Sequence, residues 1–470
     1  MNKFFSLLVF GFVLLLASAT AEAQFIEDAL RYSIPNGIIT PRVAGFNVSY
    51  HGLSDDIGAL MYNPAGLTLA SGSEISVGFG FTHNSTETDY LNMKSPLNTN
   101  DEIITHLGII VPLDEKNKKA SVGIGYFLES NFENNMEFNA FNPSSTMIAW
   151  KASQGGTFDD NFAANLFLAD KNFKTPITDS LMQSSFIQEK GGLHNLTGGL
   201  AYDISDVISV GFSIVGKWGT YKYTKDYTET DIYNKYSYWD STNFTNVDFN
   251  QLLLTESFIA DISGISGSVG FQARLMESLR FGVTIKLPTW YEISENSSQF
   301  AISHFDKGDT LQFNLSGRTT YNVTTPFVYC AGISFNFEGL TLAGGVEYSD
   351  ASQIEFSQAT TQVEQLNKDI LQQLTGQVTY GFGAEYKLPV FPAFIRASYA
   401  MTTSPYIDNN PNSNLSIISF GAGLFVGEKV RLDALVRMRD FTDKRINYGT
   451  LAYNFTTKPV DFGLQLTYRY

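Results

Sequence analysis

The final segment, "VDFGLQLTYRY" (residues 460–470), alternates apolar and polar residues up to the end of the chain. Every second residue from Val460 to Tyr470 is apolar, and the residues between them include Asp461, Gln465 and Arg469. A period of two predicts a β-strand with one apolar face and one polar face. Taken alone, this strand also fits the half-buried edge of a soluble sheet.

About 14 segments with this alternation follow residue 72. The connections between them are short and long in turn: "PLDEKNKK", "ISD", "LMES", "NFEG", "LPVFP" and "GEK" are tight, and the others run about 10 to 60 residues, notably 133–191 and 223–258. An even strand count with short periplasmic turns and long external loops predicts an all-β fold, a 14-stranded antiparallel transmembrane β-barrel. In a barrel the apolar stripe of the last strand faces lipid, and its terminal aromatic residue fits the interfacial girdle.

The amino-acid composition agrees with a barrel and limits the classes of partner and of site that the protein can have. The 470 residues are 43% hydrophobic and 17% charged, with 39 Gly, 24 Tyr and 38 Phe. Abundant aromatic residues with a mean hydropathy of -0.07 argue against a helical membrane protein. A net charge of -16 makes nucleic acid an unexpected partner. A single cysteine, Cys330, excludes an intrachain disulfide framework and a cysteine-rich metal site.

The N-terminus predicts export. Lys3 precedes an apolar run from Phe4 to Ala17, and Ala21-Glu22-Ala23 has the small-x-small form of a signal-peptidase site. We therefore expect a signal peptide over 1–23. A transmembrane anchor is the alternative, but the apolar run is short for a membrane span. The expected location is the bacterial outer membrane, with its lipids and lipopolysaccharide as surroundings and barrel-assembly machinery as the partner that recognises the aromatic C-terminal strand.

The segment before the first strand carries a distinctive turn. Asn63 can hydrogen-bond its own backbone, Pro64 fixes φ, and Gly66 permits positive φ, so "YNPAGL" predicts a turn. The run from Ala44-Gly45 through "DDIGA" and Asn63-Pro64-Ala65-Gly66 to Gly72 resembles the N-terminal hatch of the FadL/TodX family of outer-membrane transporters for hydrophobic compounds. Two further stretches, "GSVGFQARLMESLRFGVTIKLP" and "TTPFVYCAGISFNFEGLTLAGGVEYSDAS", are also similar to that family.

The resemblance implies a domain plan and a function. Residues 24–71 would form a hatch inside a barrel of residues 72–470, with Asn63, Pro64, Ala65 and Gly66 at their junction. Family members take up compounds such as long-chain fatty acids by capture at the outer loops, binding in the lumen and release through a gap near the third strand. Gly123 and Gly125 precede and begin "GYFLESNFENN" in that strand and are candidates for the kink. Relief of crowding is the ordinary alternative for both glycines.

Two further features bear on a hydrophobic ligand. The loop 133–191 interleaves aromatic and aliphatic residues with polar ones, which fits either a capture surface or a self-packed cap. Cations on the polar strand faces are candidates to hold a ligand carboxylate: Lys217, Lys286, Arg318, Arg396, Arg437 and Arg439. Ion pairs inside the lumen with Glu347, Asp433 or Asp461 are the alternative role for these cations.

No enzyme site is predicted. The five histidines, including His51, share no spacing typical of a catalytic dyad or a metal site, and no cofactor motif is present. A barrel of the same shape that serves as an interaction subunit of a secretion or surface-anchoring system is the alternative to a transporter. A non-selective porin is disfavoured by the expected plug.

Overall fold

The structure is a computed structural model that describes residues 26–70, 72–113, 119–240, 245–276, 278–358, 361–409 and 412–470. The predicted signal peptide, 1–23, lies outside these residues. Among the described helices, none has the length and apolar character needed to cross a membrane.

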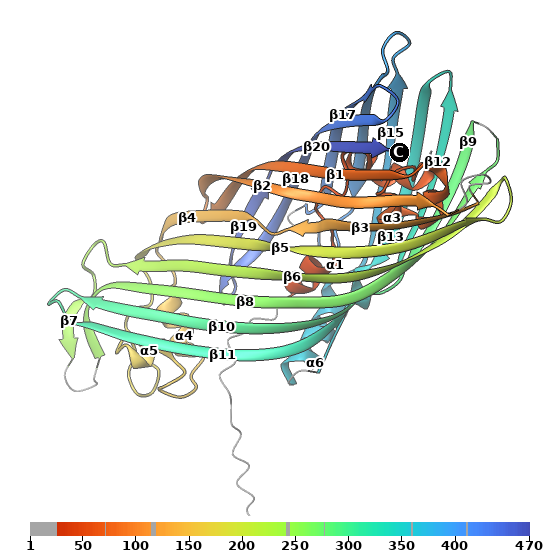
Figure 1. The fold of residues 1–470 in the computed structure, drawn as a ribbon. Helices are drawn as coiled ribbons and strands as arrows, with labels where there is room; N and C mark the ends of the chain where they lie inside the picture. Colours follow the sequence, from red (N-terminus) through yellow and green to blue (C-terminus); the bar gives the residue numbers. More distant parts are fainter. Residues whose placement is uncertain are drawn as a thin grey trace, which may run out of the picture.

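The described strands form a closed ring of 14 antiparallel strands, in which the last strand pairs with the first. Several of these strands consist of two pieces (Figure 1). In order around the ring they are β1 (Glu74–Tyr90), β2 (Met93–Pro112), β3 (Ala120–Asn131) with β4 (Asn134–Asn142), β5 (Leu181–Asp203), β6 (Ile208–Thr230), β8 (Thr245–Arg274), β9 (Leu279–Lys286) with β10 (Trp290–Phe305), β11 (Thr310–Thr324) with β12 (Val328–Phe337), β13 (Leu340–Asp350) with β14 (Glu355–Ser357), β15 (Gly376–Lys387), β16 (Ala393–Thr402), β17 (Leu415–Val426), β18 (Val430–Tyr448), and β19 (Leu451–Thr457) with β20 (Val460–Arg469). The prediction of an all-β, 14-stranded antiparallel barrel is confirmed.

Proline residues account for two of the interruptions. One strand of the ring divides into β9 and β10 around Pro288, and its neighbour divides into β11 and β12 around Pro326. Proline has no N–H to give to a ladder. The two breaks face each other, and Thr325 N donates to Thr289 O over 3.0 Å.

The two faces of the wall are inverted relative to a soluble protein. In β20, Leu464 is 62% exposed and points outward, whereas the neighbouring Gln465 is 4% exposed and points into the lumen. The outward apolar stripe of this strand also includes Phe462, Leu466 and Tyr468. An apolar exterior around a polar interior is the arrangement of a barrel that lipid surrounds.

The N-terminal segment lies inside the ring. It consists of α1 (Ile26–Ser33), α2 (Pro41–Phe46), η1 (Asn47–Gly52), α3 (Ala59–Tyr62) and η2 (Pro64–Leu69), and nearly all described residues from 38 to 70 are buried or half-buried. Figure 1 shows these red and orange elements enclosed by the strands. We call residues 26–70 the hatch.

Strands extend well into both predicted long loops. Residues 134–142 and 181–191 of the expected loop 133–191 belong to β4 and β5, and most of the expected loop 223–258 belongs to β6 and β8. The remaining connections carry α4 (Met147–Ser153), α5 (Phe162–Asn165), the short β7 (Ser237–Asp240), η3 (Ala351–Gln353) and α6 (Thr361–Gln373). Long strands, among them β5, β6, β8, β10 and β11, build one tall side of the barrel (Figure 1).

Candidate functional site

The hatch is organised by its paired aspartates. Asp56 accepts hydrogen bonds from Thr40 Oγ1 (3.1 Å), Tyr50 OH (2.5 Å) and Gly58 N (2.8 Å), which fold residues 40–58 around one buried carboxylate. Asp55 instead accepts hydrogen bonds from both Nε and Nη2 of Arg42, at 2.7 and 2.9 Å. Burial alone would raise the pKa of Asp55, but the Arg42 guanidinium outweighs it and holds that pKa below its usual range.

The predicted turn at Asn63 fixes the hatch to the wall. Asn63 Oδ1 accepts from Ala65 N over 3.2 Å and so caps η2, while Nδ2 donates to Phe271 O and to Gln272 Oε1, each over 3.0 Å. A Cβ atom at Gly270 of β8 would lie 2.1 Å from Asn63 Oδ1, so only glycine admits the hatch at this point. The structure therefore places this motif directly against β8.

An ion network joins the hatch to the opposite wall. Arg42 Nη1 donates to Glu385 of β15 over 2.6 Å, and Arg396 of β16 contacts both Glu385 (3.0 Å) and Asp433 of β18 (2.7 Å). Arg431 completes the network on Asp433. These buried charges stabilise the docked hatch only as a complete set, because removal of one partner leaves an unpaired buried charge.

The wall has a discontinuity beside the third strand. The β2–β3 ladder runs from Pro112–Ser121 to His106–Phe127 and stops there, although both strands continue. Beyond this point the described part of β2 pairs with β1 alone, while β3 shifts register at Leu128 and yields to β4 after Asn131. The break lies beyond Gly123 and Gly125, both of which sit in the regular ladder. Neither glycine marks the irregularity.

A hatch segment that the sequence analysis did not single out occupies this break. Gly37 N donates to Glu129 O over 2.9 Å. Asn36 makes two bonds to Asn131, from its Nδ2 to the carbonyl (3.0 Å) and from the Asn131 amide to its Oδ1 (2.8 Å). Arg437 of β18 holds the same segment through the carbonyls of Asn36 and Gly37. Residues 36–37 thus bond to β3 at the place where the β2–β3 ladder has ended, and we call them the sealing segment.

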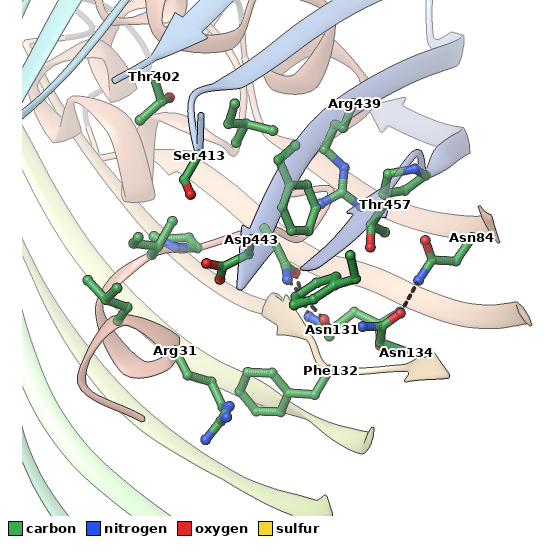
Figure 2. Close-up of a pocket in the computed structure, with 18 of the residues that line it drawn as sticks. Arg31, Asn84, Asn131, Phe132, Asn134, Thr402, Ser413, Arg439, Asp443 and Thr457 are labelled. Carbon is green, nitrogen blue, oxygen red and sulfur yellow. Dashed lines mark hydrogen bonds between the residues drawn. The ribbon is translucent and has the colours of Figure 1, made fainter. Parts of the chain in front are cut away.

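A cavity of about 310 Å³ lies between α1, the broken third strand and β18. Figure 2 shows Arg31 of α1 on one side, Phe132 and Asn134 at the β3–β4 break, and Arg439 of β18 across from them. Apolar surface comes from Leu30, Ile34, Phe132, Leu415, Ile417, Phe441 and Phe455. Polar and charged side chains make up the rest of the lining, so the cavity suits a small molecule with both an apolar and a polar part.

The arginines of the cavity share their carboxylates. Arg437 and Arg439 both contact Asp461, at 2.8 and 3.0 Å. Arg31 and Arg445 both contact Glu189, at 3.9 and 3.0 Å. Asp461 and Glu189 thus each hold two arginines, and two further carboxylates, Glu133 and Asp443, also line the cavity.

The other predicted cations are distributed around the barrel. Lys217 pairs with Glu129 at 2.7 Å, Lys286 with Glu347 at 3.2 Å, and Arg396 belongs to the hatch network. Arg318 is exposed and donates to Ser294 Oγ. Of the six, only Arg437 and Arg439 line the cavity. Pairing with Glu347, Asp433 or Asp461, the alternative role considered from the sequence, is observed for four of the six: Lys286, Arg396, Arg437 and Arg439.

The connection 143–180 folds into a cap over the other end of the lumen. Its apolar residues pack with the inner faces of neighbouring strands, and those that are buried include Met147, Ile148, Phe162, Leu166 and Leu168. Only Phe158 and Phe167 among its large apolar residues are exposed. The self-packed cap is therefore the correct interpretation of this loop in the described state, in place of an open capture surface.

One carboxylate anchors the cap. Glu229, fully buried near the end of β6, accepts from the backbone amides of Met147 (2.6 Å) and Ile148 (3.2 Å) at the start of α4. Gln183 and Tyr227 supply two more hydrogen bonds. The cap and the hatch thus close the lumen at its two ends.

No protein-family model and no curated protein matches this sequence. Solved structures do match. A FadL homologue from Pseudomonas aeruginosa is 12% identical, with a TM-score of 0.60 over 93% of this chain and 99% of that one. This chain has the FadL-type barrel fold. The toluene transporter TodX of P. putida is 11% identical (TM-score 0.53, 88% and 94% covered), and CymD, a monoaromatic hydrocarbon channel, is 13% identical (TM-score 0.51, 92% and 99% covered).

Proposed function

We propose that this protein is an outer-membrane channel of the FadL/TodX family that takes up hydrophobic compounds. The observation that carries the proposal is the position of the cavity, which abuts the break in the wall where the β2–β3 ladder ends. Residues 36–37 and the bond from Asn131 Nδ2 to Asp101 of β2 (2.7 Å) are among the contacts that a ligand would displace to leave the cavity through this break. The names of the barrels with this fold, a toluene transporter and a monoaromatic hydrocarbon channel among them, support the same reading.

Long-chain fatty acids are the first substrate class to test. The cavity offers apolar surface for an alkyl chain, and its arginine side chains are the donors suited to a carboxylate head. The outward apolar stripe of the wall fits membrane lipid and lipopolysaccharide as surroundings, and the aromatic C-terminal strand fits recognition by barrel-assembly machinery.

Reconstituted protein tests the channel directly. Uptake of a labelled long-chain fatty acid and liposome swelling in sugars are measured for the wild type, Asn63→Ala and a deletion of 24–60. We expect Asn63→Ala to keep the barrel folded and slow fatty-acid uptake, because the hatch loses its two bonds to β8. The deletion should admit sugars and lose saturable uptake. The control is Asn412→Ala, whose exposed side chain bonds within its own loop, to Asn409 and to the backbone N of Asn414.

The closed cap favours a second candidate, an interaction subunit of a secretion or surface-anchoring system. A scaffold has no need of an open lumen, and both ends of this one are closed. If the deletion of 24–60 changes neither the fatty-acid nor the sugar rate, the channel proposal fails and the scaffold takes its place.

A further inference from the structure

Three metal-ligating side chains converge where the hatch meets the wall. His51 comes from η1, Cys330 from β12 and Glu347 from β13, and their ligand atoms all lie within 4.8 Å of one another. Cys330 and Glu347 are directly paired across adjacent strands, so both side chains enter the lumen at one level. This cluster uses the one cysteine of the chain and a histidine that belongs neither to the Arg42 ion network nor to the lining of the 310 Å³ cavity.

The three groups meet at one carboxylate oxygen. Glu347 Oε2 lies 3.4 Å from His51 Nε2 and 3.5 Å from Cys330 Sγ. His51 is fully buried, and its ring packs on the ring of Tyr62 with centroids 4.9 Å apart. Donor atoms a few ångströms apart, on side chains held by packing, surround a space that one ion can fill with little movement.

We propose that His51, Cys330 and Glu347 bind one divalent transition-metal ion of the zinc type, which joins the hatch to the wall. Imidazole nitrogen, thiolate sulfur and carboxylate oxygen are the three donor types that zinc takes in proteins. Hard cations such as Mg²⁺ and Ca²⁺ prefer sites made of oxygen alone, so the nitrogen and sulfur donors select against them. Three protein ligands leave a fourth position for water.

Lys286 is the charged side chain that a bound ion would meet at Glu347. Its Nζ lies 3.2 Å from Glu347 Oε2 and 5.2 Å from the centre of the Tyr62 ring. In the metal-bound state the ammonium is expected to move to the second oxygen of Glu347, as a hydrogen-bond donor to a ligating carboxylate. The ion replaces one proton on Cys330 Sγ, which passes to solvent, so binding releases one proton and strengthens as pH rises.

A polar cavity of about 480 Å³ lies on the short-turn side of the hatch and is lined by Arg42, Asp55 and Glu385 of the ion network. Leu53, two residues after His51, and Ser334, four residues after Cys330, also line it, so the cavity lies near the cluster without reaching its three ligands. Entry of an ion from this side would avoid the cap.

Metal binding would fix η1 of the hatch more firmly to the wall. A metal bond from His51 to two wall strands adds a link beside the contacts of Gly52, whose carbonyl accepts from Ser334 Oγ (2.8 Å) and Gln272 Nε2 (3.2 Å). Loss of the metal would leave this end of η1 held to the wall by those two hydrogen bonds, while Asn47 at its other end keeps its bonds to Ser398 and Ser419. The proposal is independent of the transported compound, since it concerns the seat of the hatch.

Cobalt(II) titration of the full-length barrel in detergent tests the site. Because Cys330 is the only cysteine, a thiolate-to-cobalt charge-transfer absorption band can arise only from it. We expect one Co²⁺ per chain with this band, competition by Zn²⁺, and release of one proton. Cys330→Ser should abolish the band, and His51→Gln and Glu347→Gln should weaken binding by at least about tenfold.

His83→Gln is the matched control, because His83 bonds to Asn100 at the surface, away from the cluster, and should bind Co²⁺ as the wild type does. Circular dichroism and resistance to heat in detergent establish that each variant is folded. A second measurement, hydrogen exchange of residues 45–53, should slow with Zn²⁺ in the wild type and remain unchanged in Cys330→Ser. Wild-type protein without the thiolate band, or zinc retained equally by Cys330→Ser, would overturn the proposal.

Discussion

Gly37→Ala should release the hatch segment that seals the wall. An added Cβ atom would lie 2.3 Å from the carbonyl oxygen of Leu128 and 2.9 Å from that of Glu129. Both are backbone atoms in β3 and cannot rotate away, so residues 36–37 must move by about 1 Å to restore ordinary contact distances. That movement breaks the Gly37 N to Glu129 O bond and disturbs the two bonds between Asn36 and Asn131.

The cost follows from these contacts. Overpacking of a tight site costs about 1–3 kcal/mol, and each lost neutral hydrogen bond costs about 0.5–1.5 kcal/mol. A total of about 3 kcal/mol shifts the equilibrium between docked and released segment by about 100-fold. The shift should be local, because the Asn63 seat and the Arg42 network lie elsewhere on the hatch.

Hydrogen exchange followed by mass spectrometry measures this equilibrium. Peptides that contain Gly37 and Asn131 should exchange about 100-fold faster in Gly37→Ala than in the wild type, with the β18 peptides unchanged. Gly198→Ala is the control, since its added Cβ atom would meet nothing within 4 Å. Exchange at Gly37 and Asn131 that stays at the wild-type rate would refute the sealing role of the segment.

Three further predictions concern the wall, the hatch and the cap. Leu464→Arg should destabilise the barrel in lipid vesicles by about 2–4 kcal/mol if Leu464 lies near the midplane, and Leu464→Ala clearly less, as measured by denaturant unfolding. Arg42→Met should weaken hatch docking by about 3–5 kcal/mol at pH 7. The pKa of Asp55 is depressed in the docked state, so the Arg42–Asp55 pair contributes its full stabilisation of docking above pH about 4 and loses it as pH falls through the folded pKa. Hydrogen exchange of the hatch should show this pH dependence in the wild type. The Arg42→Met variant should lose most of it. Glu229→Gln should loosen α4 by about 1.5–3 kcal/mol, seen as faster exchange of its first amides with the hatch unaffected; an unchanged rate would show that Glu229 does not hold the cap.

The wall could be predicted from the sequence because its pattern is local. Successive side chains of a strand point to opposite sides, so alternation such as that of 460–470 assigns residues to the two faces without knowledge of their neighbours. The number of alternating segments predicted the strand count, and the alternation of short and long connections predicted the antiparallel order. The predicted ends of the strands were less accurate. The prediction assigned β4 to a loop, although Met136, Phe138 and Ala140 alternate and are buried inside the barrel.

The residues that form the sites are far apart in the sequence and come together only inside the folded barrel. His51 is far from Cys330 and Glu347 in the chain, and Gly37 meets β3 more than 90 residues later, so no spacing rule connects them. The sequence supplied a set of inward cations and their acidic partners, and the structure determined which pairs form.

The sequence by itself determined the barrel and the identity of the residues that face inward. Only the tertiary structure decided where the wall breaks, how the hatch crosses the lumen and which groups meet there. Strand faces follow from backbone geometry repeated every two residues, whereas contacts across the lumen depend on the register of every strand and on the path of the hatch. These are properties of the closed ring as a whole, which no single segment encodes.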